Sequence, residues 1–118
     1  MNFLNDPKPG ETWLVDFEPN RGAEMNKRRP AVVISEPGFT YLPLRIVVPV
    51  TDDKRRHLNL YWYVEVIADA KSGLSKPSEV DTAQCHSFDL DRFAKKLGSI
   101  RADELALIRE AVAISLGL

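Results

Sequence analysis

The chain has 118 residues, 44% of them hydrophobic, and a formal net charge of -1 at pH 7. This composition is typical of one globular domain, expected to span residues 1–118, and it excludes a function that depends on overall positive charge. The single cysteine, Cys85, excludes an internal disulfide and fits a reducing compartment. The first residues show no signal segment, and no apolar run is long enough to span a membrane. We therefore expect a cytoplasmic protein without membrane contact.

Short strands are predicted along most of the chain. Residues 1–9 contain two prolines and read as an irregular lead-in, and residues 11–17 then alternate apolar and polar side chains as a strand with one buried face. Residues 30–34 form a continuous apolar run that begins with Pro30, as in a strand buried on both faces. Further strands are expected at residues 45–51, 58–67, 78–87 and 97–101. Pro49 indicates an edge or a bulge.

One helix is predicted, at residues 102–116. Its apolar residues recur at helical spacing, namely Leu105, Ile108, Val112 and Leu116. Acidic residues occupy its first turn and Gly117 follows its end, as the helix dipole and C-cap geometry favour. Several strands followed by one helix predict a mainly β fold, a small antiparallel barrel with a C-terminal helix.

A basic cluster precedes the second strand. Lys27, Arg28 and Arg29 run directly into Pro30, so Arg29 is a permanent cation at the mouth of a core strand, where it could hold a phosphate. Charges beside an apolar run also act simply as solubility guards, and this alternative stays open. The connection before the cluster, residues 18–28, is longer than a hairpin turn requires, and it is either a functional loop or a solvated one.

Polar groups stand at the ends of two neighbouring strands. Arg29 begins one strand, while Thr51 ends the next and precedes the basic residues 54–56. If these ends meet, their cations and hydroxyl form a phosphate-binding patch. Tyr61 and Tyr63 on the outer face of the predicted strand 58–67 would either stack on bases or cover the helix or a partner.

Metal and cofactor chemistry is not expected. Cys85 and His86 are adjacent and would point to opposite faces of a strand, and His57 stands among basic residues. No metal-ligand spacing and no phosphate-loop glycine pattern occurs in the sequence. Cys85 is therefore expected to be a small core residue.

The chain resembles the MazF/PemK family of toxin endoribonucleases. The most specific part is residues 15–35, VDFEPNRGAEMNKRRPAVVIS. Supporting matches lie at residues 10–11, 50–51, 72–80, 84, 88–93 and 95–100 and in the helix ending in LGL. The resemblance implies an SH3-like barrel of the MazF/CcdB type that works as a homodimer. It also implies cleavage of single-stranded RNA at a short sequence without a metal or cofactor.

The resemblance also implies site residues. Arg29 and Thr51 match the family's central arginine and threonine, and Glu24 matches its loop glutamate. The predicted RNA-binding residues are Lys27, Lys54, Arg56, Ser78, Gln84 and His86. Many relatives carry an acid at the place of Ala83 and a basic residue at that of His86. The general base therefore stays open between Glu24, His57 and His86, with His86 favoured as a phosphate contact.

The implied reaction is attack by a ribose 2′-OH on the adjacent phosphorus. Arg29 would stabilise the negative charge that develops, and Thr51 would orient the phosphate. The implied partner is an antitoxin with an acidic segment, through which the toxin would associate indirectly with DNA. Two alternatives are a gyrase poison of the CcdB type, disfavoured by the non-aromatic end ISLGL, and a non-catalytic barrel that binds RNA or protein.

Overall fold

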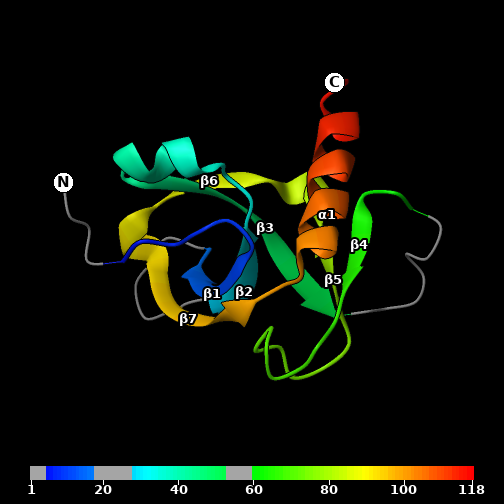
Figure 1. The fold of residues 1–118 in the computed structure, drawn as a ribbon, viewed down its shortest axis with the longest axis horizontal. Helices are drawn as coiled ribbons and strands as arrows, with labels where there is room; N and C mark the ends of the chain where they lie inside the picture. Colours follow the sequence, from blue (N-terminus) through cyan, green and yellow to red (C-terminus); the bar gives the residue numbers. More distant parts are fainter. Residues whose placement is uncertain (1–4, 18–27, 53–59) are drawn as a thin grey trace, which may run out of the picture.

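The computed structural model describes residues 5–17, 28–52 and 60–118 (Figure 1). Its strands are β1 (Glu11–Asp16), β2 (Arg28–Val33), β3 (Leu44–Asp52), β4 (Tyr63–Val66), β5 (Ser78–Asp81), β6 (His86–Asp89) and β7 (Phe93–Ser99). Three short 3₁₀ turns occur at Pro37–Tyr41, Thr82–Gln84 and Leu90–Arg92, and the helix α1 spans Ala102–Ser115. The predicted mainly β fold with a C-terminal helix is confirmed. In the part of the chain described, no helix is long and apolar enough to cross a membrane.

The strands form one antiparallel sheet in the order β4-β5-β3-β2-β1-β7, with β6 paired to the first half of β3. The ladder between β4 and β7 is not closed by strand pairing, so the sheet is an open form of the expected barrel. The connection from β4 to β5 spans this opening, because the Ser99 backbone N–H of β7 donates to the Lys71 carbonyl at 2.8 Å. A loop therefore takes the place of the closing strand pair.

Alternation along the central strands builds two hydrophobic clusters. Val32 and Val48 belong to one cluster, which Ile108 of α1 completes, while their strand neighbours Ala31 and Val47 belong to the other. Figure 1 shows α1 lying beside β4 and β5, at the end of the sheet where the first cluster is found. The two clusters explain why the central strands read as continuous apolar runs, since each of their faces is buried.

Glu104 ties the start of α1 to the sheet. Its carboxylate accepts the Arg101 backbone N–H at 2.9 Å, as an N3 glutamate does in a capping box. Its other oxygen accepts the Ile67 backbone N–H at 2.8 Å, just after β4. The residue is only 6% exposed, so capping and docking of the helix depend on the same buried carboxylate.

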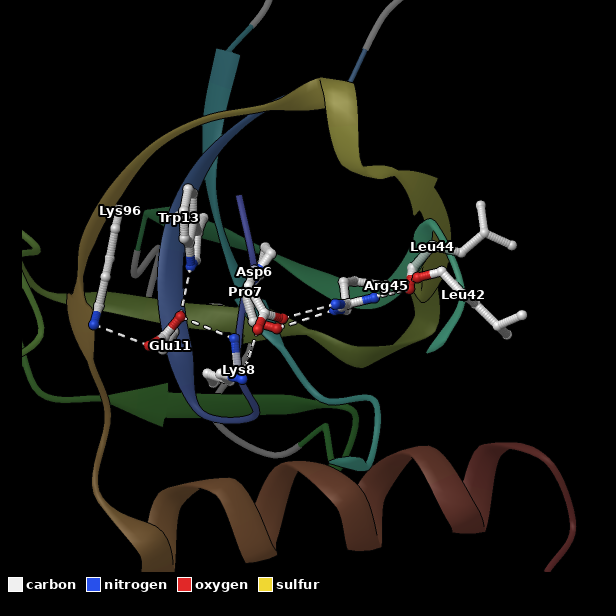
Figure 2. A network of polar contacts seen from close by, with 9 residues as sticks. All are labelled: Asp6, Pro7, Lys8, Glu11, Trp13, Leu42, Leu44, Arg45 and Lys96. Atoms are coloured by element: carbon white, nitrogen blue, oxygen red, sulfur yellow. Dashed lines mark hydrogen bonds and ion pairs between the residues drawn. The ribbon is translucent and has the colours of Figure 1, made fainter. Parts of the chain in front are cut away.

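Arg45 at the start of β3 is a buried cation that holds the N-terminal segment (Figure 2). Its guanidinium donates hydrogen bonds to the carbonyls of Pro7 (3.0 Å), Leu42 (2.8 Å) and Leu44 (2.7 Å) and to the Asp6 carboxylate (2.9 Å). A buried charge is tolerated when its donors are satisfied and an opposite charge is close. Hydrogen bonds from Lys8 and from Arg45 hold the pKa of Asp6 below its ordinary value.

Glu11 fastens the same segment from the other side (Figure 2). Its Oε1 accepts the backbone N–H of Lys8 and the indole N–H of Trp13, both at 2.9 Å, and its Oε2 lies 2.9 Å from Nζ of Lys96. Burial alone would raise the pKa of Glu11, but the hydrogen bonds from Lys96, Lys8 and Trp13 outweigh it and lower the pKa. The predicted lead-in is therefore irregular but fixed, in the part that the structure describes.

Two predicted strands are wrong in their extent. Residues 58–59 of the strand expected at 58–67 lie outside the described part of the chain. The described residues 60–67 contain only β4, because a turn closed by the Tyr63 N–H on the Leu60 carbonyl (3.1 Å) precedes it. The strand expected at residues 78–87 is broken into β5 and β6, because the Asp81 carboxylate accepts the Ala83 backbone N–H (3.0 Å) and starts a 3₁₀ turn. Local side-chain hydrogen bonds of this kind compete with strand pairing.

The remaining strand predictions differ in smaller ways. β2 already begins at Arg28, two residues before Pro30, and β7 begins at Phe93 instead of residue 97. Phe93 is 2% exposed in the core, a burial that its polar neighbours concealed in the sequence. Pro49 lies on neither an edge strand nor a bulge of the β2–β3 ladder, but it falls between the pairing of β3 with β6, which ends at Val47, and the pairing with β5, which starts at Val50. The missing N–H of Pro49 thus faces the break between two partner strands.

Candidate functional site

Arg29 and Thr51 come together at one end of the central strands. Ala31 of β2 is paired with Pro49 of β3, and the same register continued by two residues sets Arg29 opposite Thr51. Both residues line one hollow of about 530 Å³. The Arg29 side chain is exposed and Thr51 is partly buried. The structure thus brings together the two strand ends that sequence reasoning singled out.

The hollow is lined by both apolar and polar residues. Its apolar lining comes from Pro30, Val50, Leu74 and Leu97. Its polar lining comes from Arg29, Thr51, Ser75, Lys76 and Ser78, and Gly73 lines it as well. The Ser78 hydroxyl donates to the Lys76 carbonyl at 2.7 Å, which holds this part of the lining. Cations and hydroxyls beside apolar side chains suit a ligand that joins a phosphate to a flat or apolar group.

One wall of the hollow is the loop 69–77, which is locked internally. The Ser72 N–H donates to the Asp69 carboxylate at 2.8 Å, and the Asp69 N–H donates to the Ser72 hydroxyl at 3.1 Å. The Thr12 hydroxyl in turn donates to the Ser72 carbonyl at 2.6 Å, a buried bond between the loop and β1. These bonds hold a loop that sequence reasoning did not recognise as a wall of the site.

Two glycines let this loop approach β7. Gly73 has a φ of +73°, and a Cβ on it would lie 2.1 Å from the Leu97 carbonyl oxygen. A Cβ on Gly98 would lie equally close, 2.1 Å, to the Lys71 carbonyl oxygen. Neither position accepts a side chain without moving backbone, so the close approach depends on both glycines. The sequence signal for this contact was two separate glycines.

A polar row crosses four strands beside the hollow. Thr51 of β3 is paired with Glu79 of β5, and Glu79 is paired with Glu65 of β4, so that Arg29 stands at the other end of the row. Paired residues on adjacent strands share a face and are near neighbours. Glu79 is only 2% exposed. Sequence reasoning missed this buried acid beside Thr51, because residues 78–87 read as one weak polar strand.

Gln84 and His86 lie away from this hollow. Gln84 donates its side-chain N–H to the Asp81 carboxylate at 2.8 Å, within the turn that separates β5 from β6. His86 stacks on Phe88, with ring centroids 5.1 Å apart and planes 9° apart, and meets the edge of Phe17 at 5.9 Å. Both predicted residues are exposed, but neither lines the hollow that contains Arg29. They would meet the same ligand only if it extends across the surface.

Residues 8–116 match a family model described as a PemK-like, MazF-like toxin of type II toxin-antitoxin systems. The chain belongs to the PemK/MazF toxin family. Endoribonuclease MazF9 of Mycobacterium tuberculosis is 32% identical over 115 residues, covering 92% of this chain and 95% of the relative. Endoribonuclease MazF of Staphylococcus epidermidis is 32% identical over 110 residues, with 92% and 90% covered.

Solved structures agree with this membership. MazF from Deinococcus radiodurans superposes with a TM-score of 0.75 at 28% identity, covering 97% of this chain and 99% of that one. A MazE-MazF complex from the same organism gives a TM-score of 0.77 at 28% identity, with 97% and 98% covered. The expected resemblance to the MazF/PemK family is confirmed.

Several site predictions for this PemK/MazF-family chain fall outside the described residues: Glu24, Lys27, Lys54, Arg56 and His57. Among the residues that the structure describes, no three His, Cys, Asp or Glu side chains gather as a metal site. The prediction that catalysis needs no metal stays a prediction.

The structure also bears on the predictions made for Cys85 and for the two tyrosines. Cys85 is exposed, so its assignment to the core is wrong; it follows the 3₁₀ turn that interrupts the predicted strand. Although the residue as a whole is exposed, desolvation of its sulfur raises the pKa of the thiol, which disfavours a reactive thiolate. Tyr61 and Tyr63 line a hollow together with Leu107 and Ile114 of α1, and Tyr61 is 51% exposed, so the choice between stacking on bases and covering the helix or a partner stays a prediction.

Proposed function

We propose that this PemK/MazF-family chain is a toxin endoribonuclease that cleaves single-stranded RNA at a short sequence and is neutralised by an antitoxin. The observation that carries the proposal is the meeting of Arg29 and Thr51 at one hollow. Relatives named as endoribonucleases and a related MazE-MazF complex support it. The gyrase-poison and non-catalytic alternatives are not favoured, because they explain neither the meeting of Arg29 and Thr51 nor the similarity to proteins named as endoribonucleases.

The reaction needs little from the protein beyond positioning and charge. The ribose 2′-oxygen bonds to phosphorus and loses its proton, while the bond from phosphorus to the 5′-oxygen breaks and that oxygen takes up a proton. The products are a 2′,3′-cyclic phosphate and a 5′-hydroxyl. Arg29 offers donors in a fixed fork and keeps its charge, so it stabilises the equatorial phosphate oxygens. Thr51 hydrogen-bonds the phosphate, and requiring a 2′-OH explains selection of RNA over DNA.

The sequence offers three candidates for the residue that accepts the 2′-OH proton: Glu24, His57 and His86. Glu79 is paired with Thr51 but is only 2% exposed and does not line the hollow, so we do not add it to them. The ring of His86 stacks on Phe88 and lies outside the hollow that contains Arg29 and Thr51. Because it lies apart from these two residues, His86 remains our proposed contact to a phosphate instead of the base. We assign the RNA-contacting surface to Ser78 at the hollow and to Gln84 and His86 beyond it.

The proposed assembly follows from the same reasoning. The toxin acts as a homodimer of single-domain chains, and an acidic antitoxin segment occupies the cationic site and excludes RNA. Through the antitoxin the complex would also associate indirectly with DNA. We propose the cytoplasm as the place of action, on the grounds of the RNA substrate and the single cysteine.

Cleavage of a long single-stranded RNA in EDTA tests the proposal. The wild-type protein should yield fragments with 5′-hydroxyl ends, and Arg29→Ala should reduce kcat by about a hundredfold or more. Arg28→Ala is the matched control, because it removes the same charge from the adjacent position of β2, whose side chain points to the other face. Equal losses in both variants, or activity that requires added magnesium, would contradict the assignment.

A further inference from the structure

A second hollow adjoins the one that contains Arg29 and Thr51. It has a volume of about 330 Å³ and lies between β4 with the residues that follow it and residues 75–78. Ser75, Lys76 and Ser78 line both hollows, so a single stretch of chain forms the wall between them. A ligand that crosses this wall would occupy both hollows at once.

The wall between the hollows is fixed in place. Ser78 is 7% exposed and its hydroxyl donates to the Lys76 carbonyl at 2.7 Å. Further back in the same loop, Gly73 is packed against the backbone of β7. Thr51 and Glu65 stand two strands apart in the polar row, a separation of about 10 Å. Thr51 of the first hollow and Glu65 of the second are therefore close enough for one extended strand of RNA to reach both.

The two hollows differ in the charged residues that line them. Arg29 and Lys76 supply cations to the first hollow, and Lys76 also lines the second. Glu65, which is exposed, lines the second hollow and also the hollow beside Tyr61 and Tyr63. A carboxylate repels phosphate, and it can accept hydrogen bonds but cannot donate them. It therefore favours a group that carries N–H donors. A phosphate thus belongs beside the cations and a base beside Glu65.

Of the four bases, guanine matches a carboxylate best. Its Watson–Crick edge carries the N1–H and the N2 amino group side by side, which together can bind both carboxylate oxygens. Adenine and cytosine present one amino group next to an acceptor nitrogen, and uracil presents one N–H between two carbonyls. Unpaired bases are commonly read on this edge in single-stranded RNA.

We propose that the second hollow is a base-binding subsite for a nucleotide next to the scissile phosphate, in which Glu65 selects guanine. The inference rests on the proposed endoribonuclease function and adds a sequence preference to it. Lys76, which lines both hollows, would contact the RNA backbone where it passes from one hollow to the other. Glu65 is a specificity residue and takes no part in the chemical step.

The test is cleavage of a short RNA library with randomised positions, followed by sequencing of the 5′-hydroxyl ends. The wild-type protein should enrich guanine at one position adjoining the cut. Glu65→Gln should reduce that enrichment about fivefold or more, the lower range for loss of one bidentate base contact, while total cleavage persists. Glu36→Gln removes the same charge from an exposed position outside both hollows and should leave the enrichment unchanged.

A second measurement needs no variant protein. Replacing guanosine by inosine at the enriched position removes the N2 amino group and should slow cleavage of a defined substrate. Wild-type cleavage without guanine enrichment, an enrichment that Glu65→Gln leaves intact, or equal cleavage of the inosine substrate would overturn the subsite alone. Absence of cleavage by the wild-type protein would overturn the proposed function, and the subsite with it.

Discussion

Gly73→Ala tests whether the loop beside Arg29 must be held against β7. The substitution adds a single methyl group, but Gly73 has a φ of +73° and the new Cβ would lie 2.1 Å from the Leu97 carbonyl oxygen and 2.6 Å from its carbon. Both neighbouring atoms belong to the backbone and cannot rotate away. The loop must therefore withdraw by about 1 Å to regain ordinary contact distances, and it carries Ser75 and Lys76 with it.

The expected loss of stability has two parts. A left-handed conformation costs an alanine about 1–2 kcal/mol. Backbone shifts forced by an overpacked methyl group add about 1–3 kcal/mol. Gly117→Ala separates the two, because Gly117 has a φ of +77° but a Cβ added there would meet no atom within 4 Å. Gly117→Ala should therefore lose only the first part, and Gly73→Ala should lose both.

Urea unfolding followed by circular dichroism gives the two free energies of unfolding. RNA cleavage at a temperature well below both melting transitions gives kcat/KM. We expect Gly73→Ala to reduce kcat/KM at least tenfold, since misplacement of binding groups by about 1 Å can cost up to a hundredfold. Gly117→Ala should cleave like the wild type. Equal losses of stability, or a Gly73→Ala protein with wild-type kcat/KM, would refute the reasoning.

Four further predictions concern single side chains. Thr51→Val keeps the shape but removes the hydroxyl, so kcat should fall about tenfold or more while the melting temperature changes little. Arg45→Met should lower the free energy of unfolding by about 2–4 kcal/mol, because it leaves buried carbonyls unpaired, yet kcat should persist below the melting transition. The carboxylate of Glu11 has a lowered pKa, so its stabilising contribution is present above its ordinary pKa and is lost as pH falls through the lower folded value. In urea unfolding between pH 6 and 3, the free energy of unfolding should therefore decline less for Glu11→Gln than for the wild type. His86→Arg should retain cleavage as a phosphate contact, and a variant that binds RNA but does not cut it would make His86 the base instead.

Much of the local structure could be predicted from the sequence. Apolar periodicity indicated the strands β1 and β3 and the helix α1, since such patterns are encoded within a few residues. The chemistry of Arg29 and Thr51 was also readable, because one is a permanent cation and the other a hydroxyl at a strand end. Family motifs at residues 15–35 and 50–51 then implied a common function for both.

Only the tertiary structure decided what surrounds that pair. The register between β2 and β3 brings Arg29 beside Thr51, and β5 adds the buried Glu79 to the same row. The wall that separates the two hollows depends on Gly73 meeting the backbone of β7, a contact between segments far apart in the chain. The broken strand after Asp81 depends on a side-chain hydrogen bond that outweighs strand propensity. These features follow from long-range pairing, close backbone approach and single hydrogen bonds, and none of these leaves a periodic signal in the residues that make it.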